Sequence, residues 1–159
     1  MNMSMEFSFD EGPKVMVNVL LEEGVIQNVE LKRSSRFIVK ANEKSEGLKE
    51  WCAAYARGKH PKTKLQFNQK GLTVLRKEVL SHMKKIPFGK SRSYKDLAVQ
   101  SGREGGYRAI GQACGANPFP LFYPCHRVLA STGKIGGFSQ GPEIKRRLLQ
   151  FEKILFCEN

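Results

Sequence analysis

Residues 93–115, Ser-Tyr-Lys-Asp-Leu-Ala-Val-Gln-Ser-Gly-Arg-Glu-Gly-Gly-Tyr-Arg-Ala-Ile-Gly-Gln-Ala-Cys-Gly, hold the pattern that decides the fold of the second half of the chain. The S-x-x-D spacing of Ser93 and Asp96 is that of an N-terminal helix cap, and it predicts a short helix that stops at Gly102. After a turn rich in glycine, a second short helix is predicted over residues 107–115. The order helix, turn, helix is typical of a DNA-reading module.

The second of these helices has an unusual composition for a helix that reads bases. Helices in the major groove usually present several long polar side chains. Here the residues are mainly small, with two larger ones at the start: Tyr107, Arg108, Ala109, Gly111, Ala113, Gly115 and Ala116. One interpretation is that glycine and alanine pack this helix against its neighbours. The other is that the helix lies in a narrow minor groove, which Arg108 enters to reach the base stack.

The chain before this module reads as one further helix and a separate small unit. Apolar residues at helical spacing predict a helix from Leu72 that ends at Pro87-Phe88-Gly89. Nearer the N-terminus, the alternation over residues 15–31 around a turn at Glu22-Glu23-Gly24 predicts a hairpin, and residues 37–39 a third strand. Ser45 is expected to cap a helix with one apolar face, formed by Leu48, Trp51, Cys52 and Tyr55.

A polar stretch without periodicity, residues 60–71, separates the two parts. We therefore predict two domains, an α/β domain over residues 1–67 with a small antiparallel sheet plus a helix, and a mainly helical domain over residues 72–159.

The segment Pro124-Cys125-His126-Arg127-Val128 is the strongest candidate for chemistry. A free cysteine is mostly a thiol at neutral pH, but an adjoining imidazole that takes its proton makes the reactive thiolate plentiful. The alternative is that Cys125 is an inert buried residue beside its apolar neighbours. Three prolines, at 118, 120 and 124, exclude a helix and favour a stiff loop, which is where reactive groups are usually mounted.

A glutamate continues the apolar stripe of the last predicted helix, which Pro142 opens. The stripe comprises Ile144, Leu148, Phe151 and Leu155, and Glu152 lies along it. A carboxylate in that position is costly unless it is paired. It either turns to solvent, meets Lys145 or Lys153, or serves a buried site.

Composition favours a polyanionic partner and reduced thiols. The formal net charge is +12, and residues 72–159 carry 15 Lys/Arg against 6 Asp/Glu. This balance suits the phosphates of a nucleic acid. Four cysteines without C-x-x-C spacing and three scattered histidines predict no structural zinc or other metal site. No basic segment followed by an apolar run opens the chain, so we expect a cytoplasmic protein with no membrane association, near the nucleoid, or nuclear in a eukaryote.

Taken together, these motifs resemble the O6-alkylguanine-DNA alkyltransferase family over roughly residues 73–152. The resemblance is carried by Tyr94, Arg108, Asn117-Pro118, Pro124-Cys125-His126-Arg127-Val128, Gly136-Gly137-Phe138-Ser139 and Glu152. It implies an RNase H-like N-terminal domain and a winged-helix C-terminal domain. It also implies a monomer that needs no cofactor, binds double-stranded DNA through the minor groove and turns the damaged nucleotide out.

The resemblance further implies a single, irreversible transfer of an alkyl group from guanine O6, and also from thymine O4, to Cys125. Glu152 would bind His126, which accepts the thiol proton through a water, and Asn117 would brace the turn. Tyr94 would donate a proton to the leaving guanine. The DNA-binding residues would be Tyr107, Arg108, Ala109, Gly111, Ala113, Gly115 and Arg127. The pocket for the base would be formed by Val128, Gly136, Gly137, Phe138 and Ser139.

Two positions depart from the family pattern, since many members have tyrosine at Phe138 and a small residue at Gln140. Gln140 is expected to narrow the pocket. Two other function classes compete with alkyl transfer: a winged-helix lesion recogniser or regulator without chemistry, and a papain-like cysteine hydrolase. Cys125 argues against the first, and the adjacency of cysteine and histidine argues against the second.

Overall fold

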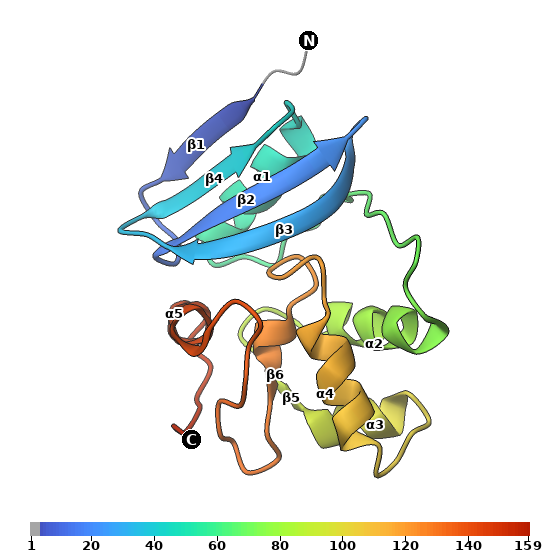
Figure 1. The fold of residues 1–159 in the computed structure, drawn as a ribbon. Helices are drawn as coiled ribbons and strands as arrows, with labels where there is room; N and C mark the ends of the chain where they lie inside the picture. The colour runs from blue at the N-terminus through green and yellow to red at the C-terminus, as the bar shows by residue number, and fades with distance from the viewer. Residues whose placement is uncertain (1–3) are drawn as a thin grey trace. The chain divides into compact units, whose positions relative to one another are not determined.

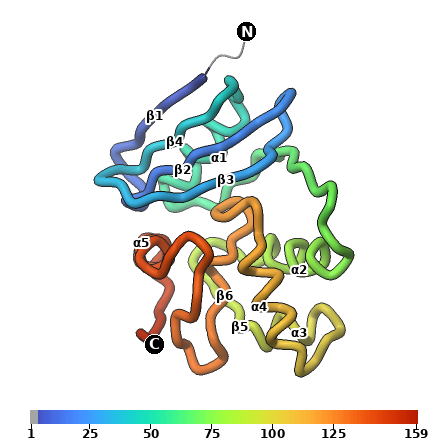
Figure 2. The backbone as a smooth tube through the Cα atoms, in the orientation of Figure 1, coloured from blue at the N-terminus to red at the C-terminus, as the bar shows by residue number. Residues whose placement is uncertain are grey.

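The structure, a computed structural model, describes residues 4–159 and divides into two compact units, Met1–Asn68 and Gln69–Asn159. Figures 1 and 2 show the path of the chain through each unit. Within residues 4–159, no helix combines the length and the apolar composition that crossing a membrane requires.

A four-stranded sheet with one helix forms the first unit. The strands β1 (Met5–Phe9), β2 (Val15–Glu22), β3 (Val25–Arg33) and β4 (Phe37–Ala41) lie in the order β1-β4-β2-β3. The hairpin β2–β3 is confirmed, and its turn has positive φ at Glu23 and Gly24, as the twist of a tight hairpin favours. The predicted antiparallel sheet is wrong in one respect, because β4 pairs parallel with β2 and the sheet is mixed.

Helix α1 (Glu46–Ala56) covers one face of this sheet (Figure 1). The predicted cap is confirmed, since the Ser45 hydroxyl accepts a hydrogen bond from the Leu48 amide at 3.2 Å. Alternate residues of β2 point to the helix and are buried, and Phe37 meets Tyr55 with 6.0 Å between ring centroids. Burial of one sheet face against one helix face forms the core of this unit.

The second unit contains α2 (Val74–Lys84), α3 (Tyr94–Gln100), α4 (Tyr107–Gly115) and α5 (Pro142–Phe151), with a 3-10 turn η1 (Cys125–Arg127). Both helices of the predicted helix-turn-helix are confirmed. The capping box is complete, because Ser93 Oγ accepts from the Asp96 amide at 3.0 Å and Asp96 Oδ2 accepts from the Ser93 amide at 2.9 Å. Helix α2 begins after its cap Thr73 rather than at Leu72 and ends three residues before Pro87.

A two-stranded parallel ladder sets the position of the active segment. Strand β5 (Arg92–Ser93) pairs with β6 (Val128–Leu129), with Arg92 opposite Val128. Because β5 leads directly into α3 and η1 leads directly into β6, the ladder holds the first residue of α3 beside the Cys125 turn.

The segment between β6 and α5, residues 130–141, runs out and back (Figure 2) and is fixed at its centre. The Ile135 amide donates to the Cys157 carbonyl, and the Cys157 amide to the Gly133 carbonyl, both at 2.8 Å. Helix α5 ends at Phe151, and Lys153 adopts positive φ, so the predicted continuation of the apolar stripe to Leu155 is wrong. Leu155 is 93% exposed, whereas Ile154 joins the core.

Candidate active site

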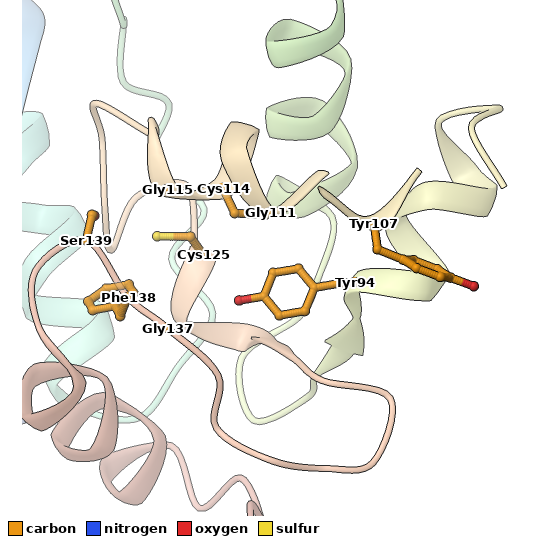
Figure 3. A pocket seen from close by; sticks show the side chains of 9 residues that line it. All are labelled: Tyr94, Tyr107, Gly111, Cys114, Gly115, Cys125, Gly137, Phe138 and Ser139. Carbon is orange, nitrogen blue, oxygen red and sulfur yellow. The ribbon is translucent and has the colours of Figure 1, made fainter. Parts of the chain in front are cut away.

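A cavity of about 460 Å³ opens in the second unit, and Cys125 lies on its wall. Figure 3 shows the Cys125 sulfur pointing into it, with the Tyr94 ring reaching toward it from α3. The lining comes from α3, α4, η1 and the segment before α5: Tyr94, Tyr107, Gly111, Cys114, Gly115, Cys125, Gly137, Phe138 and Ser139. Residues far apart in sequence therefore line one cavity together with the Cys125 sulfur.

Cys125 is buried, with 3% of its surface exposed, and it starts a 3-10 turn directly after the proline-rich segment. Burial raises the pKa of the Cys125 thiol to about 11, although a hydrogen bond from Asn117 and the charge of Lys145 act in the opposite direction. The expectation of an abundant thiolate at neutral pH is therefore wrong. Its physical reason is desolvation, which disfavours the charged form.

Asn117 ties together both ends of the segment that precedes the cysteine. Its side-chain nitrogen donates to the Tyr123 carbonyl at 2.8 Å, and its oxygen accepts from the Phe119 amide at 2.9 Å. The Asn117 side chain is buried, and these two hydrogen bonds supply partners for both its amide nitrogen and its amide oxygen, as buried polar atoms require. The segment that presents Cys125 is thereby held in one shape.

His126, Arg127 and Glu152 form a buried charged cluster behind the cysteine. His126 Nε2 bonds to Glu152 Oε2, and Arg127 Nε donates to Glu152 Oε1 at 2.7 Å. The Gly89 amide also donates to Glu152 Oε1, at 3.1 Å. Of the three interpretations of Glu152, the buried site is the one that the structure shows, since the residue is 3% exposed and its carboxylate bonds to His126, Arg127 and Gly89.

The protonation states follow from these contacts. Burial alone would raise the pKa of Glu152, but the charges and hydrogen bonds of His126 and Arg127 outweigh it and lower this pKa to about 2. Burial lowers the pKa of His126, so its imidazole is neutral at pH 7. Because a carboxylate only accepts, the Nε2 atom carries the proton, which leaves a lone pair on Nδ1. That Nδ1 atom is buried and has no hydrogen-bond partner among residues 4–159.

Arg127 was predicted to bind DNA, and this prediction is wrong. Its guanidinium is buried, bonded to Glu152 and to the Ile86 carbonyl at 2.7 Å, and lies over the Phe88 ring. A guanidinium is well suited to this task, since its fixed donors match a carboxylate and a carbonyl together. Arg127 orients Glu152 from inside the protein.

Tyr94 supplies a hydroxyl that stays protonated. Burial, followed by the neighbouring Cys114 and Cys125, raises the pKa of Tyr94 to about 12. A tyrosine that holds its proton at neutral pH acts as a hydrogen-bond donor toward anything in the cavity. Figure 3 shows the hydroxyl end of the ring directed to the side of Cys125.

The residues of α4 that were predicted to contact DNA divide into two groups. Arg108 is exposed, Tyr107 is 47% exposed, and Gly111 and Gly115 line the cavity mouth. Ala109 is half-buried, while Ala113 is buried among its neighbours, so its assignment to DNA is wrong.

The two interpretations of the small residues on α4 can now be separated. A Cβ atom added at Gly111 or Gly115 would meet no atom within 4 Å. Neither glycine is therefore required for packing inside the protein, and both leave a helix face without side chains, half-buried at Gly111 and exposed at Gly115.

The glycine-rich segment reaches the cavity only in part. Gly137, Phe138 and Ser139 line it, whereas Val128, Gly136 and Gln140 do not. Val128 is buried, and its carbonyl accepts a hydrogen bond from Lys145. The predictions that Val128 and Gly136 form the pocket wall, and that Gln140 narrows it, are wrong because none of these three residues lines the cavity.

Lys145 is the residue of the site that sequence reasoning missed. It is fully buried on α5, and its ammonium donates to the Val128 carbonyl at 2.7 Å and to the Gly137 carbonyl at 3.3 Å. A signal was available, because residue 145 lies four positions before Leu149 and seven before Glu152 on the same helical face.

Comparison with known proteins agrees with this geometry. The profile described as "6-O-methylguanine DNA methyltransferase, DNA binding domain" matches residues 74–154. A methylated-DNA–protein-cysteine methyltransferase of Methanosarcina barkeri is 40% identical over 63% of this chain and 63% of its own length. The constitutive one of Bacillus subtilis is 35% identical over 84% of this chain and 76% of its own.

Among solved structures, Mycobacterium tuberculosis OGT in complex with DNA is similar, with a TM-score of 0.70 and 30% identity over 85% of each chain. The match to the Methanosarcina barkeri protein thus leaves more than a third of that relative uncovered, whereas this structural match extends over most of both chains.

Proposed function

The chain belongs to the methylated-DNA–protein-cysteine methyltransferase family, and on that premise we propose that it repairs DNA by moving an alkyl group from guanine O6 to its own Cys125. The observation that carries the proposal is a cysteine on a cavity wall, followed directly in the chain by a neutral buried imidazole that an ionised glutamate orients. Nucleophile, base and orienter occur in the order that such chemistry needs.

The reaction is written as one displacement at carbon. The Cys125 thiol loses its proton, through a water, to His126 Nδ1 while its sulfur attacks the alkyl carbon. The carbon–sulfur bond forms, the bond from carbon to guanine O6 breaks, and the bonding pair goes to the guanine. Tyr94 donates a proton to the departing base and is reprotonated at the expense of the proton that His126 took up, so the thiol proton ends on the guanine and both side chains return to their starting states. The product is a thioether, which nothing in the site hydrolyses, so each molecule acts once.

The high pKa of Cys125 fits this proton movement. A thiol that is protonated at rest reacts only when a base takes its proton in the transition state, and His126 is neutral and therefore able to do so. Glu152, held ionised, stabilises the imidazolium that forms.

Double-stranded DNA carrying O6-alkylguanine is the proposed partner. The alkyl group of a stacked base cannot reach a sulfur inside a cavity, so the nucleotide must be turned out of the helix. The exposed start of α4, with Arg108, and its bare glycine face suit a minor groove, with Arg108 filling the gap in the base stack. The excess of basic residues in this half of the chain supports phosphate contact.

Several finer assignments are part of the same proposal. We assign the first unit to an RNase H-like domain and the second to a winged helix, since a mixed sheet with a helix precedes a helix-turn-helix with a small ladder. We further propose that the protein acts as a monomer, without a metal or other cofactor, in the cytoplasm close to the nucleoid, or in the nucleus of a eukaryote. Guanine O6 is the preferred substrate atom and thymine O4 a second one.

Titration of the protein against a damaged duplex tests the proposed function. A fixed amount of a short duplex with one O6-methylguanine is incubated with increasing protein, and restored guanine is measured by nucleoside chromatography. We expect restored guanine to equal the protein added, molecule for molecule, until the duplex is exhausted. Restoration that continues beyond one guanine per protein, or none at all, would refute single-use transfer.

Replacing Gly111 with leucine tests the role of the bare helix face. Leucine stabilises a helix relative to glycine by up to about 1 kcal/mol. A Cβ atom at position 111 meets no atom within 4 Å. The free energy of unfolding is therefore expected to stay equal or rise, whereas affinity for duplex DNA falls about ten-fold or more because the backbone can no longer approach. Denaturant titration and fluorescence anisotropy measure the two effects. A destabilised variant with normal DNA affinity would favour the packing interpretation instead.

A further inference from the structure

Lys145 is a buried cation without a carboxylate partner. No Asp or Glu oxygen among residues 4–159 lies within ion-pair distance of its ammonium, which is held by the two carbonyls of Val128 and Gly137. Charged groups that are fully buried are normally paired, since an uncompensated charge is costly. A lysine kept in this state indicates that a negative charge arises nearby at some stage.

The groups around Lys145 include the sulfur that becomes negatively charged when the proposed reaction begins. The ammonium lies 5.9 Å from the centroid of the Tyr94 ring, which belongs to α3. Cys114 on α4 and Cys125 and His126 on η1 interact with it electrostatically. Burial keeps Tyr94, Cys114 and Cys125 protonated at rest, with pKa values of about 12, 12 and 11. Of these three groups, Cys125 is the one from which the proposed reaction removes a proton to make a nucleophile. Glu152, at the end of the same helix, is engaged by His126, Arg127 and Gly89.

We infer that Lys145 is a positioning residue whose ammonium, fixed on the Val128 and Gly137 carbonyls, acts as the counter-charge of the Cys125 thiolate. The inference rests on the proposed function, in which that sulfur is the nucleophile. The same two hydrogen bonds join the strand that follows the cysteine turn to the segment that forms the cavity wall. Lys145 therefore sets both the charge and the shape of the cavity around the sulfur.

Lys145 and Cys125 shift each other's pKa values in the directions expected of a cation beside an anion. The Lys145 charge lowers the pKa of Cys125 against the effect of burial, and Cys125 in turn raises the pKa of Lys145 against its own burial. Burial nevertheless brings the pKa of Lys145 down to about 8, so the ammonium is present at pH 7 and is lost as the pH rises through about 8. The counter-charge is thus available in the physiological range.

The test measures the thiol directly, without DNA. The rate at which iodoacetamide alkylates Cys125 is followed from pH 6 to pH 11 by peptide mass analysis, which separates this cysteine from the other three. Lys145→Met removes the charge and the hydrogen bonds, Lys145→Gln keeps donors but removes the charge, and Lys145→Arg keeps the charge. Lys134→Met, an exposed lysine of the same unit, is the matched control for net charge.

We expect both neutral variants to react about ten-fold more slowly than the unchanged protein at pH 7.5, since the reactive species is the thiolate and the ammonium is present at that pH. The difference in rate should shrink above pH 8, because the unchanged protein loses the ammonium as the pH rises through about 8. Lys145→Arg and Lys134→Met should stay within about three-fold of the unchanged protein. If Lys145→Met does not fold, as judged by thermal unfolding, Lys145→Gln supplies the same comparison.

A folded neutral variant of Lys145 whose Cys125 alkylation rate follows the same pH profile as the unchanged protein would overturn the inference. An equal decrease of this rate in Lys134→Met would overturn it as well. The proposed function stands or falls separately, because it is judged by guanine restoration in the unchanged protein. If the unchanged protein restores no guanine but the neutral Lys145 variants still react more slowly with iodoacetamide, the proposed function fails and the inference about Lys145 stands. If guanine is restored but these variants react at the unchanged rate, the inference fails and the proposed function stands.

Discussion

Replacing Cys125 with alanine is expected to abolish alkyl transfer while leaving affinity for a duplex with O6-methylguanine within about two-fold of the unchanged protein. The sulfur is the atom to which the new bond is made, so its removal deletes the reaction rather than slowing it. Binding is little affected, because Cys125 is buried on the cavity wall and the exposed basic residues lie elsewhere. Guanine restoration and fluorescence anisotropy on the same preparation measure the two properties.

Cys114 is the matched control for this experiment, since its side chain lines the same cavity. Burial and the neighbouring Cys125 raise the pKa of Cys114 to about 12, and no imidazole follows it in the chain. Cys114→Ala is therefore expected to keep transfer. Methylation of Cys114 in the Cys125→Ala protein at an undiminished rate would show that the wrong sulfur had been assigned.

Glu152→Gln is expected to lower the free energy of unfolding at pH 7 by about 3–5 kcal/mol, because it leaves the Arg127 guanidinium buried without its counter-charge. Transfer should slow as well, since a neutral amide no longer stabilises the imidazolium of His126. Glu143→Gln is the control, a glutamate of the same helix whose ion pairs with Arg146 and Arg147 are partly exposed and contribute little.

The pH dependence gives the same prediction a second readout. The folded-state pKa of Glu152 is about 2, below the ordinary value of 4.5. Its stabilisation is therefore fully present above pH 4.5 and is lost as the pH falls toward 2. Denaturant titrations at pH 7 and pH 3 should show the difference between the two proteins shrinking in acid. Equal unfolding midpoints at pH 7 would contradict the role given to Glu152.

Local signals in the sequence predicted local structure well. The Ser93 and Asp96 capping box, the Ser45 cap and the Glu23-Gly24 turn are each decided by residues within a few positions of one another, and each is present. Strand β1 also had a signal, the alternation of Phe7 and Phe9 with polar residues, which is short enough to be overlooked. The parallel pairing of β2 with β4 had none, since strand order depends on contacts distant in sequence.

The chemistry at Cys125 was visible in the sequence, but its electrostatics were not. Adjacent cysteine and histidine indicate a nucleophile and a base, yet whether the thiol is charged depends on how deeply the fold buries it. Arg127 shows the same limit, because an arginine in a basic chain favours DNA until the fold turns it inward to Glu152. Lys145 was missed because a lysine within an amphipathic helix is usually solvated.

The most direct measurement of the central claim is the site of the transferred group. A duplex carrying guanine with a trideuterated O6-methyl group is incubated with excess protein, and the digested protein is sequenced by mass spectrometry. We expect one trideuteromethyl group, on the sulfur of Cys125 and on no other residue, with unmodified guanine left in the DNA. A label that stays on the DNA, passes to water or appears on another side chain would contradict it.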